Sequence, residues 1–184
     1  MMTHDSGRAF IDRARHYLAS EYTTKLRKAV DTVPAEQLWW RPNGESNSVG
    51  NLLLHLTGNV QQWIVAGVGR APDSRDRAAE FAAIEGAAAS TLLANLQSVL
   101  ESADRVLGTL SPDHLLEARD IQGRHVTVLD AIFHVVEHFS LHLGQIIYIA
   151  KAVTPGSIRF YDDAGGLPTS LGVKDLLCVL CGSA

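Results

Sequence analysis

Cysteine is scarce in this 184-residue chain, in which Cys178 and Cys181 are the only two. A disulfide between them would close a tiny loop and stabilise nothing elsewhere, so cysteine usage favours a reducing, cytoplasmic location. Residues 1–8 lack the apolar core of a secretion signal, which supports the same expectation.

An excess of basic charge is also missing. Sixteen basic and 20 acidic residues give a net charge of −4, and the pI is about 6.0. The chain therefore offers no global positive field for nucleic acid or an anionic membrane, and we expect neither as a partner. The uncharged stretch 48–69 includes Asn51, His55 and Asn59, which are costly in hydrocarbon, so it predicts a buried helix and no membrane span.

Sustained strand-like alternation is absent as well, whereas helical apolar periodicity recurs in four segments. These segments are about 6–30, 48–68, 87–110 and 127–153. The second begins at a cap formed by Asn47 or Ser48, and Thr127 with Asp130 resembles a capping box at the fourth. The pattern predicts an all-α domain over residues 1–153, followed by an arm or tail at 154–184 that is not a second domain.

The fourth segment is apolar around most of its circumference and carries three regularly spaced histidines. Between Ala131 and Ala150 its only formal charge is Glu137, so the helix must be buried or lie at a subunit interface. His134, His138 and His142 follow at steps of four, and each step places the next imidazole on the same face, about 6 Å farther along the axis.

Two adjacent imidazoles of this kind can clamp one metal ion, but three on one straight helix cannot, because the outer two are about 12 Å apart along the axis. One end of the triplet must have another role. The alternative is that all three are hydrogen-bonded histidines of the core or an interface, although several neutral imidazoles on an apolar face are costly to desolvate without a partner.

The second helix carries a polar stripe that supplies a further ligand. The stripe consists of Asn51, His55, Asn59 and Gln62. Only His55 suits a transition metal, while the amides can orient ligands or form inter-helix hydrogen bonds. For His55 to face His138 and His142, the second and fourth helices must run antiparallel. This predicts an up-down-down-up four-helix bundle, with a long connection over 69–86 that traverses it.

Two motifs resemble the DinB/YfiT-like superfamily of metal-dependent four-helix-bundle proteins. One runs from Asn47 through His55-Leu56 to Gln62-Trp63-Ile64, and the other is the histidine pair directly before Gly144-Gln145. The stretch Asp73-Ser74-Arg75-Asp76-Arg77 with Glu80-Phe81 is similar to a member subfamily of unknown function. The resemblance covers residues 6–153. It implies His55, His138 and His142 as the metal ligands, with Asn51, Asn59, His134 and Gln145 as residues that support the ligands or contact substrate.

Three neutral imidazoles leave a divalent ion with an open coordination position, which is typical of catalytic sites. Zinc and nickel both suit such ligands. The resemblance implies a metal-dependent S-transferase that uses a low-molecular-weight thiol, with a metal-dependent hydrolase as the alternative; a non-enzymatic metal-binding stress or dimerisation module is a third hypothesis. Glu137 is turned about 100° from His138 around the helix, so it is poorly placed as a general base, which favours thiol chemistry.

The apolar fourth helix also predicts a homodimer. In a four-helix bundle part of every helix faces outward, and this helix has hardly any polar face to expose. Either the 154–184 arm or a second subunit must cover it. The resemblance favours the homodimer, because members of the superfamily often pair.

Overall fold

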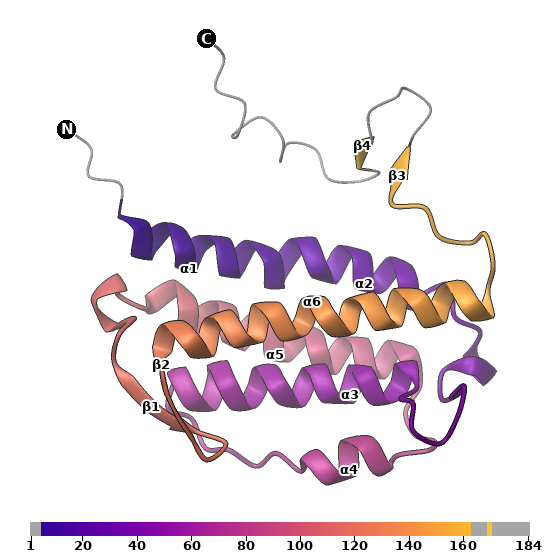
Figure 1. Ribbon diagram of the computed structural model, residues 1–184, viewed down its shortest axis with the longest axis horizontal. Coiled ribbons are helices and arrows are strands. Elements are labelled where there is room, and N and C mark those ends of the chain that lie inside the picture. The colour runs from indigo at the N-terminus through magenta and orange to yellow at the C-terminus, as the bar shows by residue number, and fades with distance from the viewer. Residues whose placement is uncertain (1–4, 163–168, 171–184) are drawn as a thin grey trace.

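The computed structural model describes residues 5–162 and 169–170, and these residues are mostly helical (Figure 1). The helices are α1 (Ser6–His16), α2 (Tyr22–Val30), α3 (Val49–Val60), α4 (Arg77–Ala82), α5 (Ala89–Thr109) and α6 (Val128–Val153). Two short strand pairs are β1 (Ala118–Ile121) with β2 (Arg124–Thr127), and β3 (Tyr161–Asp162) with β4 (Thr169–Ser170). Within the described part of the chain, no helix combines the length and the apolarity needed to cross a membrane.

The first predicted helix is confirmed, with one irregularity. Asp5 caps it, because its Oδ1 accepts hydrogen bonds from the N–H groups of Gly7 and Arg8. A π-helical turn at Tyr17–Glu21 joins α1 to α2 within what is otherwise one continuous helix. Insertions of this kind re-aim the side chains that follow them, a feature that apolar periodicity alone does not reveal.

The second predicted helix is confirmed at both ends. Ser48 caps α3: its Oγ accepts from the N–H of Asn51, and the Asn51 Oδ1 accepts from the N–H of Ser48 in return. After Val60 the helix continues as a π-helical stretch, Gln61–Val68, which stops at Gly69. The buried face of α3 includes three polar side chains, Asn51, His55 and Asn59.

The third and fourth predicted helices correspond to α5 and α6. The capping box of α6 is present, since the Thr127 Oγ1 accepts from the N–H of Asp130 and the Asp130 carboxylate accepts from the N–H of Thr127. These two reciprocal bonds satisfy backbone donors that the first turn of a helix otherwise leaves free. Helix α6 places the three regularly spaced histidines beside α3.

The expectation of no sheet is wrong for two short strand pairs, of which β1–β2 is the longer. Strands β1 and β2 are antiparallel and four residues long each, and the turn between them has positive φ at both Gln122 (54°) and Gly123 (73°). Two positive φ angles make a tight turn whose twist suits a hairpin. Ile121 is buried against Gly67, so the hairpin covers the end of the π-helical stretch. Four residues are too few for alternation to stand out in the sequence.

The long connection after α3 contains a further helix that the periodicity did not indicate. Helix α4 is only six residues long and packs against α3 (Figure 1). Asp76 caps it by accepting a hydrogen bond from the N–H of Ala79. The connection is therefore more than a link across the bundle, because α4 brings a buried carboxylate, Glu80, to α3.

The core lies where the long helices face one another. Helix α3 packs against α5 and α6, and the α1–α2 helix packs against the other sides of α5 and α6. The largest fully buried side chains include Trp63, Phe139, Ile11, Leu52, Leu96 and Ile146, contributed by all of these helices. Burying such side chains contributes about 1.5–3 kcal/mol each before conformational entropy is counted.

The segment after α6 returns along α2 rather than over the exposed face of α6. The Thr154 Oγ1 donates to the Thr32 carbonyl, Ile158 is buried, and the Lys28 ammonium donates to the Arg159 carbonyl while lying 5.6 Å from the centre of the Phe160 ring. Cys178 and Cys181 lie outside the described residues.

Candidate metal centre

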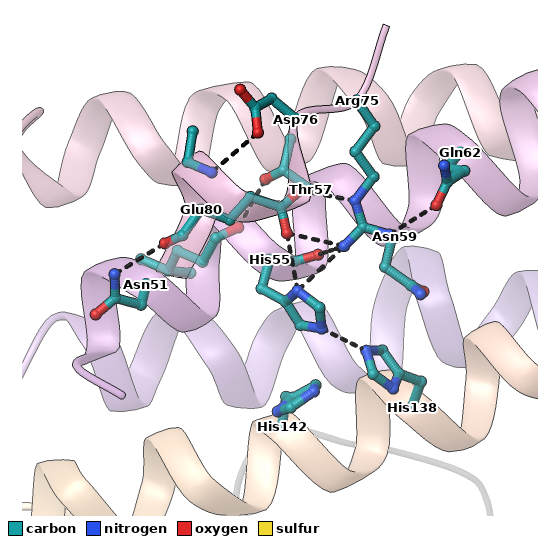
Figure 2. A network of polar contacts seen from close by, with 12 residues as sticks. Asn51, His55, Thr57, Asn59, Gln62, Arg75, Asp76, Glu80, His138 and His142 are labelled. Atoms are coloured by element: carbon teal, nitrogen blue, oxygen red, sulfur yellow. Dashed lines mark hydrogen bonds and ion pairs between the residues drawn. The ribbon is translucent and has the colours of Figure 1, made fainter. Parts of the chain in front are cut away.

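Three histidines from two helices converge between α3 and α6. His55 extends from α3 and has an exposed fraction of only 3%, whereas His138 and His142 extend from successive turns of α6 and are partly buried. One ring nitrogen from each lies within 4.8 Å of the others, and the Nε2 atoms of His55 and His138 are 2.8 Å apart. Figure 2 shows the three rings pointing toward one another. This arrangement can hold a metal ion.

Glu80 fixes the orientation of the His55 ring. The Glu80 Oε2 lies 2.8 Å from His55 Nδ1, on the side of the ring opposite to His138. A carboxylate bonded to one ring nitrogen of a histidine fixes both the ring and its tautomer, and it raises the basicity of the other nitrogen. His55 therefore carries its proton on Nδ1 and presents the Nε2 lone pair to the centre.

Arg75 in turn holds Glu80 by a two-pronged ion pair. The Arg75 Nε donates to Glu80 Oε1 at 2.7 Å, and its Nη2 donates to Oε2 at 2.8 Å. The Arg75 side chain is only 2% exposed, so this pair is shielded from solvent. Such bidentate pairs fix geometry more strongly than a single contact does. The Arg75 Nη1 also donates to Gln62, whose own amide donates to Asp73.

The ionised carboxylate of Glu80 determines which nitrogen of His55 carries the proton. Burial raises the pKa of this carboxyl, but hydrogen bonds from Arg75 and His55 together outweigh burial and leave the pKa below its ordinary value. The Arg75 Nη2 also lies 3.1 Å from His55 Nδ1. Two donors cannot bond to each other, and an ionised carboxylate needs a donor, so the proton of Nδ1 belongs to the bond with Glu80.

The histidines of α6 are neutral. Burial lowers the pKa of His138 to about 3, and the neighbouring His142 and His55 lower it further in the same direction. Burial also lowers the pKa of His142 and of His134, against smaller opposing contributions from Gln145 and Glu137. Because only the unprotonated imidazole coordinates a metal, these side chains need lose no proton at neutral pH before a metal binds.

Gln145 plays at His142 a part similar to that of Glu80 at His55. The Nδ1 of His142 lies 2.7 Å from the Gln145 Oε1, one turn farther along α6. An amide oxygen accepts only, so His142 is protonated on Nδ1 and its Nε2 is free. Gln145, predicted to support a ligand or contact substrate, thus lies beside His142, a candidate ligand.

His134 lies next to the cluster but is not one of its three members. Its Nε2 is 3.3 Å from the Asn59 amide nitrogen, and its ring centre is 4.2 Å from that of Trp63. The Asn59 Oδ1 and the Trp63 Nε1 are buried without a partner among the described residues. His134 and Asn59 therefore form a separate polar pair one turn from His138.

Asn51 holds α4 in place and has no hydrogen-bonding capacity left. Its amide nitrogen donates to the carbonyls of Glu80 (2.9 Å) and Ala83 (2.7 Å), while its oxygen accepts from the N–H and hydroxyl of Ser48. Because Glu80 lies on α4, Asn51 acts on the centre by positioning the helix that carries the carboxylate (Figure 2).

Arg75 and Glu80 had no predicted role, although both belong to the motif Asp73-Ser74-Arg75-Asp76-Arg77 with Glu80-Phe81. They follow His55 by 20 and 25 positions, in a connection without helical periodicity. The signal that could have identified them is an acidic residue and an arginine close together beside an otherwise apolar pair of helices.

Comparisons with known proteins agree with this fold. A family model described as "Protein of unknown function (DUF1572)" matches residues 5–161. Among solved structures, the chain is similar to a DinB-like protein from Bacillus cereus ATCC 10987, at 17% sequence identity with a TM-score of 0.59 over 73% of this chain and 89% of that chain. At this identity the likeness shows the fold alone, which is DinB-like. No curated protein matches the chain.

Proposed function

The chain belongs to the family of proteins of unknown function DUF1572, and because this family assigns no reaction, we propose a function from the site itself. We propose that the protein binds one divalent transition metal through His55, His138 and His142 and transfers a low-molecular-weight thiol to an electrophile. The convergence of the three imidazoles, with ring nitrogens within 4.8 Å of one another, carries the proposal.

The donor set fits zinc or nickel. Both ions accept imidazole nitrogen readily, and the Nε2 atoms of His55 and His142 are available because the Nδ1 atoms are engaged by Glu80 and Gln145. Three neutral ligands leave at least one coordination position open. An ion bound there would lower the pKa of a coordinated thiol and so favour the nucleophilic thiolate at neutral pH.

The positions of the carboxylates favour thiol transfer over hydrolysis. Glu137 lies on the exposed side of α6, and both oxygens of Glu80 accept hydrogen bonds from Arg75, so neither is poised as a general base at the centre. In thiol transfer the sulfur loses its proton to solvent and forms a C–S bond as the leaving group departs with its electron pair. This step needs no general base among the residues around the centre.

We also propose the up-down-down-up arrangement for the bundle, over the domain 1–153. Three observations support it. Arg8 at the start of α1 donates to the Leu110 carbonyl after α5, while Arg27 near the end of α2 donates to Gln97 in the first half of α5. Residues His55 and Asn59 of α3 meet His138 and His134 of α6 in reversed order. Gly69, at the end of the π-helical stretch, lies against Val106 near the end of α5.

The test of the function is turnover of 1-chloro-2,4-dinitrobenzene with a panel of small thiols, by the zinc-loaded or nickel-loaded protein. We expect thiol-dependent release of chloride, followed by absorbance of the thioether, and its loss in His138→Ala and after chelation. Normal turnover after complete metal removal would rule out the mechanism. Hydrolysis of ester or amide substrates without any thiol dependence would favour the hydrolase, and stoichiometric metal without either activity would favour a binding module.

A further inference from the structure

A cavity of about 610 Å³ opens between α6 and the segment that leads into α3. Its apolar lining includes Leu52, Leu141, Tyr148 and Ile149. Its polar lining is Glu45, Ser46, Asn47 and Gln145. The volume lies within the range of small-molecule sites, which combine apolar walls with a few convergent polar groups in this way.

Gly144 is the clearest sign that this space is kept open for an occupant. It lies in the interior of α6 and lines the cavity, and a Cβ added there would meet nothing within 4 Å. Glycine inside a helix is less favourable than alanine by about 1 kcal/mol, so a helical glycine ordinarily has a packing reason. Here no described part of the chain supplies one, because the missing side chain would point into empty space.

The charge of the cavity restricts what fits. Glu45 is its only charged lining residue, and no lysine or arginine is among the described residues that form its wall. The Glu45 carboxylate is exposed and has no ion pair in the described part of the chain. An anionic head would meet an uncompensated negative charge, whereas a neutral or cationic head would not.

Gln145 connects this cavity to the metal centre. Its side chain lines the cavity, and its Oε1 accepts the Nδ1 proton of His142 at 2.7 Å. Leu141 and Gly144 flank His142 along the same helix. A molecule that lies against this wall therefore contacts Leu141, which directly precedes the candidate ligand His142 in the sequence.

We propose that this cavity binds the apolar body of the electrophilic substrate, with a neutral or cationic head toward Glu45 and the reacting carbon toward His142. That the bound molecule is a substrate rests on the proposed function. The binding site itself requires only the cavity, its glycine and its charge, so it can be tested without turnover.

The test measures binding of the neutral fluorescent probe N-phenyl-1-naphthylamine to the full-length protein. We expect saturable binding of one probe per chain, weakened at least tenfold in Gly144→Leu, because the new side chain fills the cavity. The matched control is Ala94→Leu, which adds the same side chain at an exposed position of α5 and should leave the affinity unchanged. Gly144→Leu should keep or raise the midpoint of thermal unfolding, since helix propensity improves and nothing is displaced.

Competition with two molecules of equal chain length tests the charge preference. Octylamine should displace the probe at a lower concentration than octanoate, and Glu45→Gln should remove at least half of that difference in competing concentration. Equal competition by both molecules in the wild-type protein would overturn the choice of head group.

Failure of this proposal is distinguishable from failure of the proposed function. His138→Ala should abolish turnover and metal binding but leave probe affinity within twofold of wild type. Unchanged probe affinity in Gly144→Leu, or no binding by the wild type, would overturn the cavity proposal even if thiol transfer holds. If Gly144→Leu instead changes only the sedimentation coefficient, the cavity is a contact between chains and the proposal fails.

Discussion

Gly58 controls how closely the Arg75–Glu80 ion pair approaches α3. A Cβ added at this position would overlap the Glu80 Oε1 and lie 2.7 Å from the Arg75 Nε. The glycine is therefore required by a close approach of side chains rather than by its backbone conformation. Through it, the sequence of α3 leaves room for the carboxylate that orients His55.

Gly58→Ala should weaken metal binding although position 58 contacts no metal ligand. The added methyl displaces Glu80, and losing a carboxylate behind a histidine ligand typically costs about 10–100-fold in metal affinity. Competitive titration of zinc against a chromophoric chelator measures the dissociation constant. Gly108→Ala on α5 is the control, because its Cβ would meet only ordinary contacts of 3.4 Å with Arg15. An unchanged affinity in Gly58→Ala would contradict the role of Glu80.

Single alanine substitutions of the histidines should separate the ligands from their neighbour. His55→Ala, His138→Ala and His142→Ala each remove one of the three donors, so stoichiometric metal should be lost on dialysis. His134→Ala should retain about one metal per chain, because its nitrogen faces Asn59. Elemental analysis of the purified variants gives the result. Equal loss of metal in His134→Ala would show that the ligand register is shifted by one turn.

At the scale of elements, Arg15 and Asp104 join α1 to α5. The Arg15 Nε and Nη2 donate to the two carboxylate oxygens of Asp104 at 2.8 and 3.0 Å. Both side chains are about one third exposed, which limits the contribution of the pair to roughly 0.2–1 kcal/mol. The hydrogen bonds from Arg15 lower the pKa of the Asp104 carboxyl, against a smaller opposing effect of burial.

This pair predicts a specific loss of stability in acid. Because the pKa of Asp104 is lower in the folded than in the unfolded chain, its contribution is present above the unfolded pKa of about 3.9 and is lost as pH falls through the folded pKa. Asp104→Asn should therefore reduce the free energy of unfolding by roughly 0.2–1 kcal/mol at pH 7 and by less below pH 3. Urea titrations at the two pH values measure this. Glu36→Gln, at an exposed position, controls for the lost charge; a pH-independent deficit in Asp104→Asn would refute the linkage.

The long helices, and the shared face of the three histidines of α6, could be predicted from the sequence because both depend on local periodicity. Ser48 and Thr127 mark helix starts by their own hydrogen bonds, and steps of four fix which imidazoles share a face. The β1–β2 hairpin was not predicted because apolar and polar residues alternate over only four positions in each strand. Helix α4 and the role of Glu80 were not predicted because their positions depend on tertiary contacts with Asn51 and Arg75. No short-range sequence pattern encodes such contacts.

At the scale of the whole molecule, α6 exposes an apolar stripe. Phe133, Leu141 and Tyr148 have exposed fractions of 59%, 56% and 76%. The described segment after α6, up to Phe160, packs beside Lys28 of α2 and does not extend over them. Large exposed apolar side chains that lie on one face of a helix are typical of contact surfaces.

We therefore expect a homodimer formed through α6 around Phe133, outside the cavity wall to which Leu141 and Tyr148 belong. Sedimentation velocity at micromolar concentration should give a species of twice the 19.9 kDa chain mass. Phe133→Glu should shift the protein toward monomer without loss of helicity, whereas Ile84→Glu, at an exposed apolar position before α5, should not. A single 19.9 kDa species in the wild type at these concentrations would refute the dimer.

The candidate ligands His55 and His138 are separated by 83 positions, and they meet only when α3, α4 and α6 are assembled. An unfolded chain cannot present the three nitrogens together, so the metal would bind only the native state. Such binding shifts the folding equilibrium toward the native state. At a free metal concentration one hundred times the dissociation constant, this linkage adds about 2.7 kcal/mol to the free energy of unfolding. The bundle's resistance to unfolding would thus vary with cellular metal supply, so metal starvation would leave more chains open to proteases.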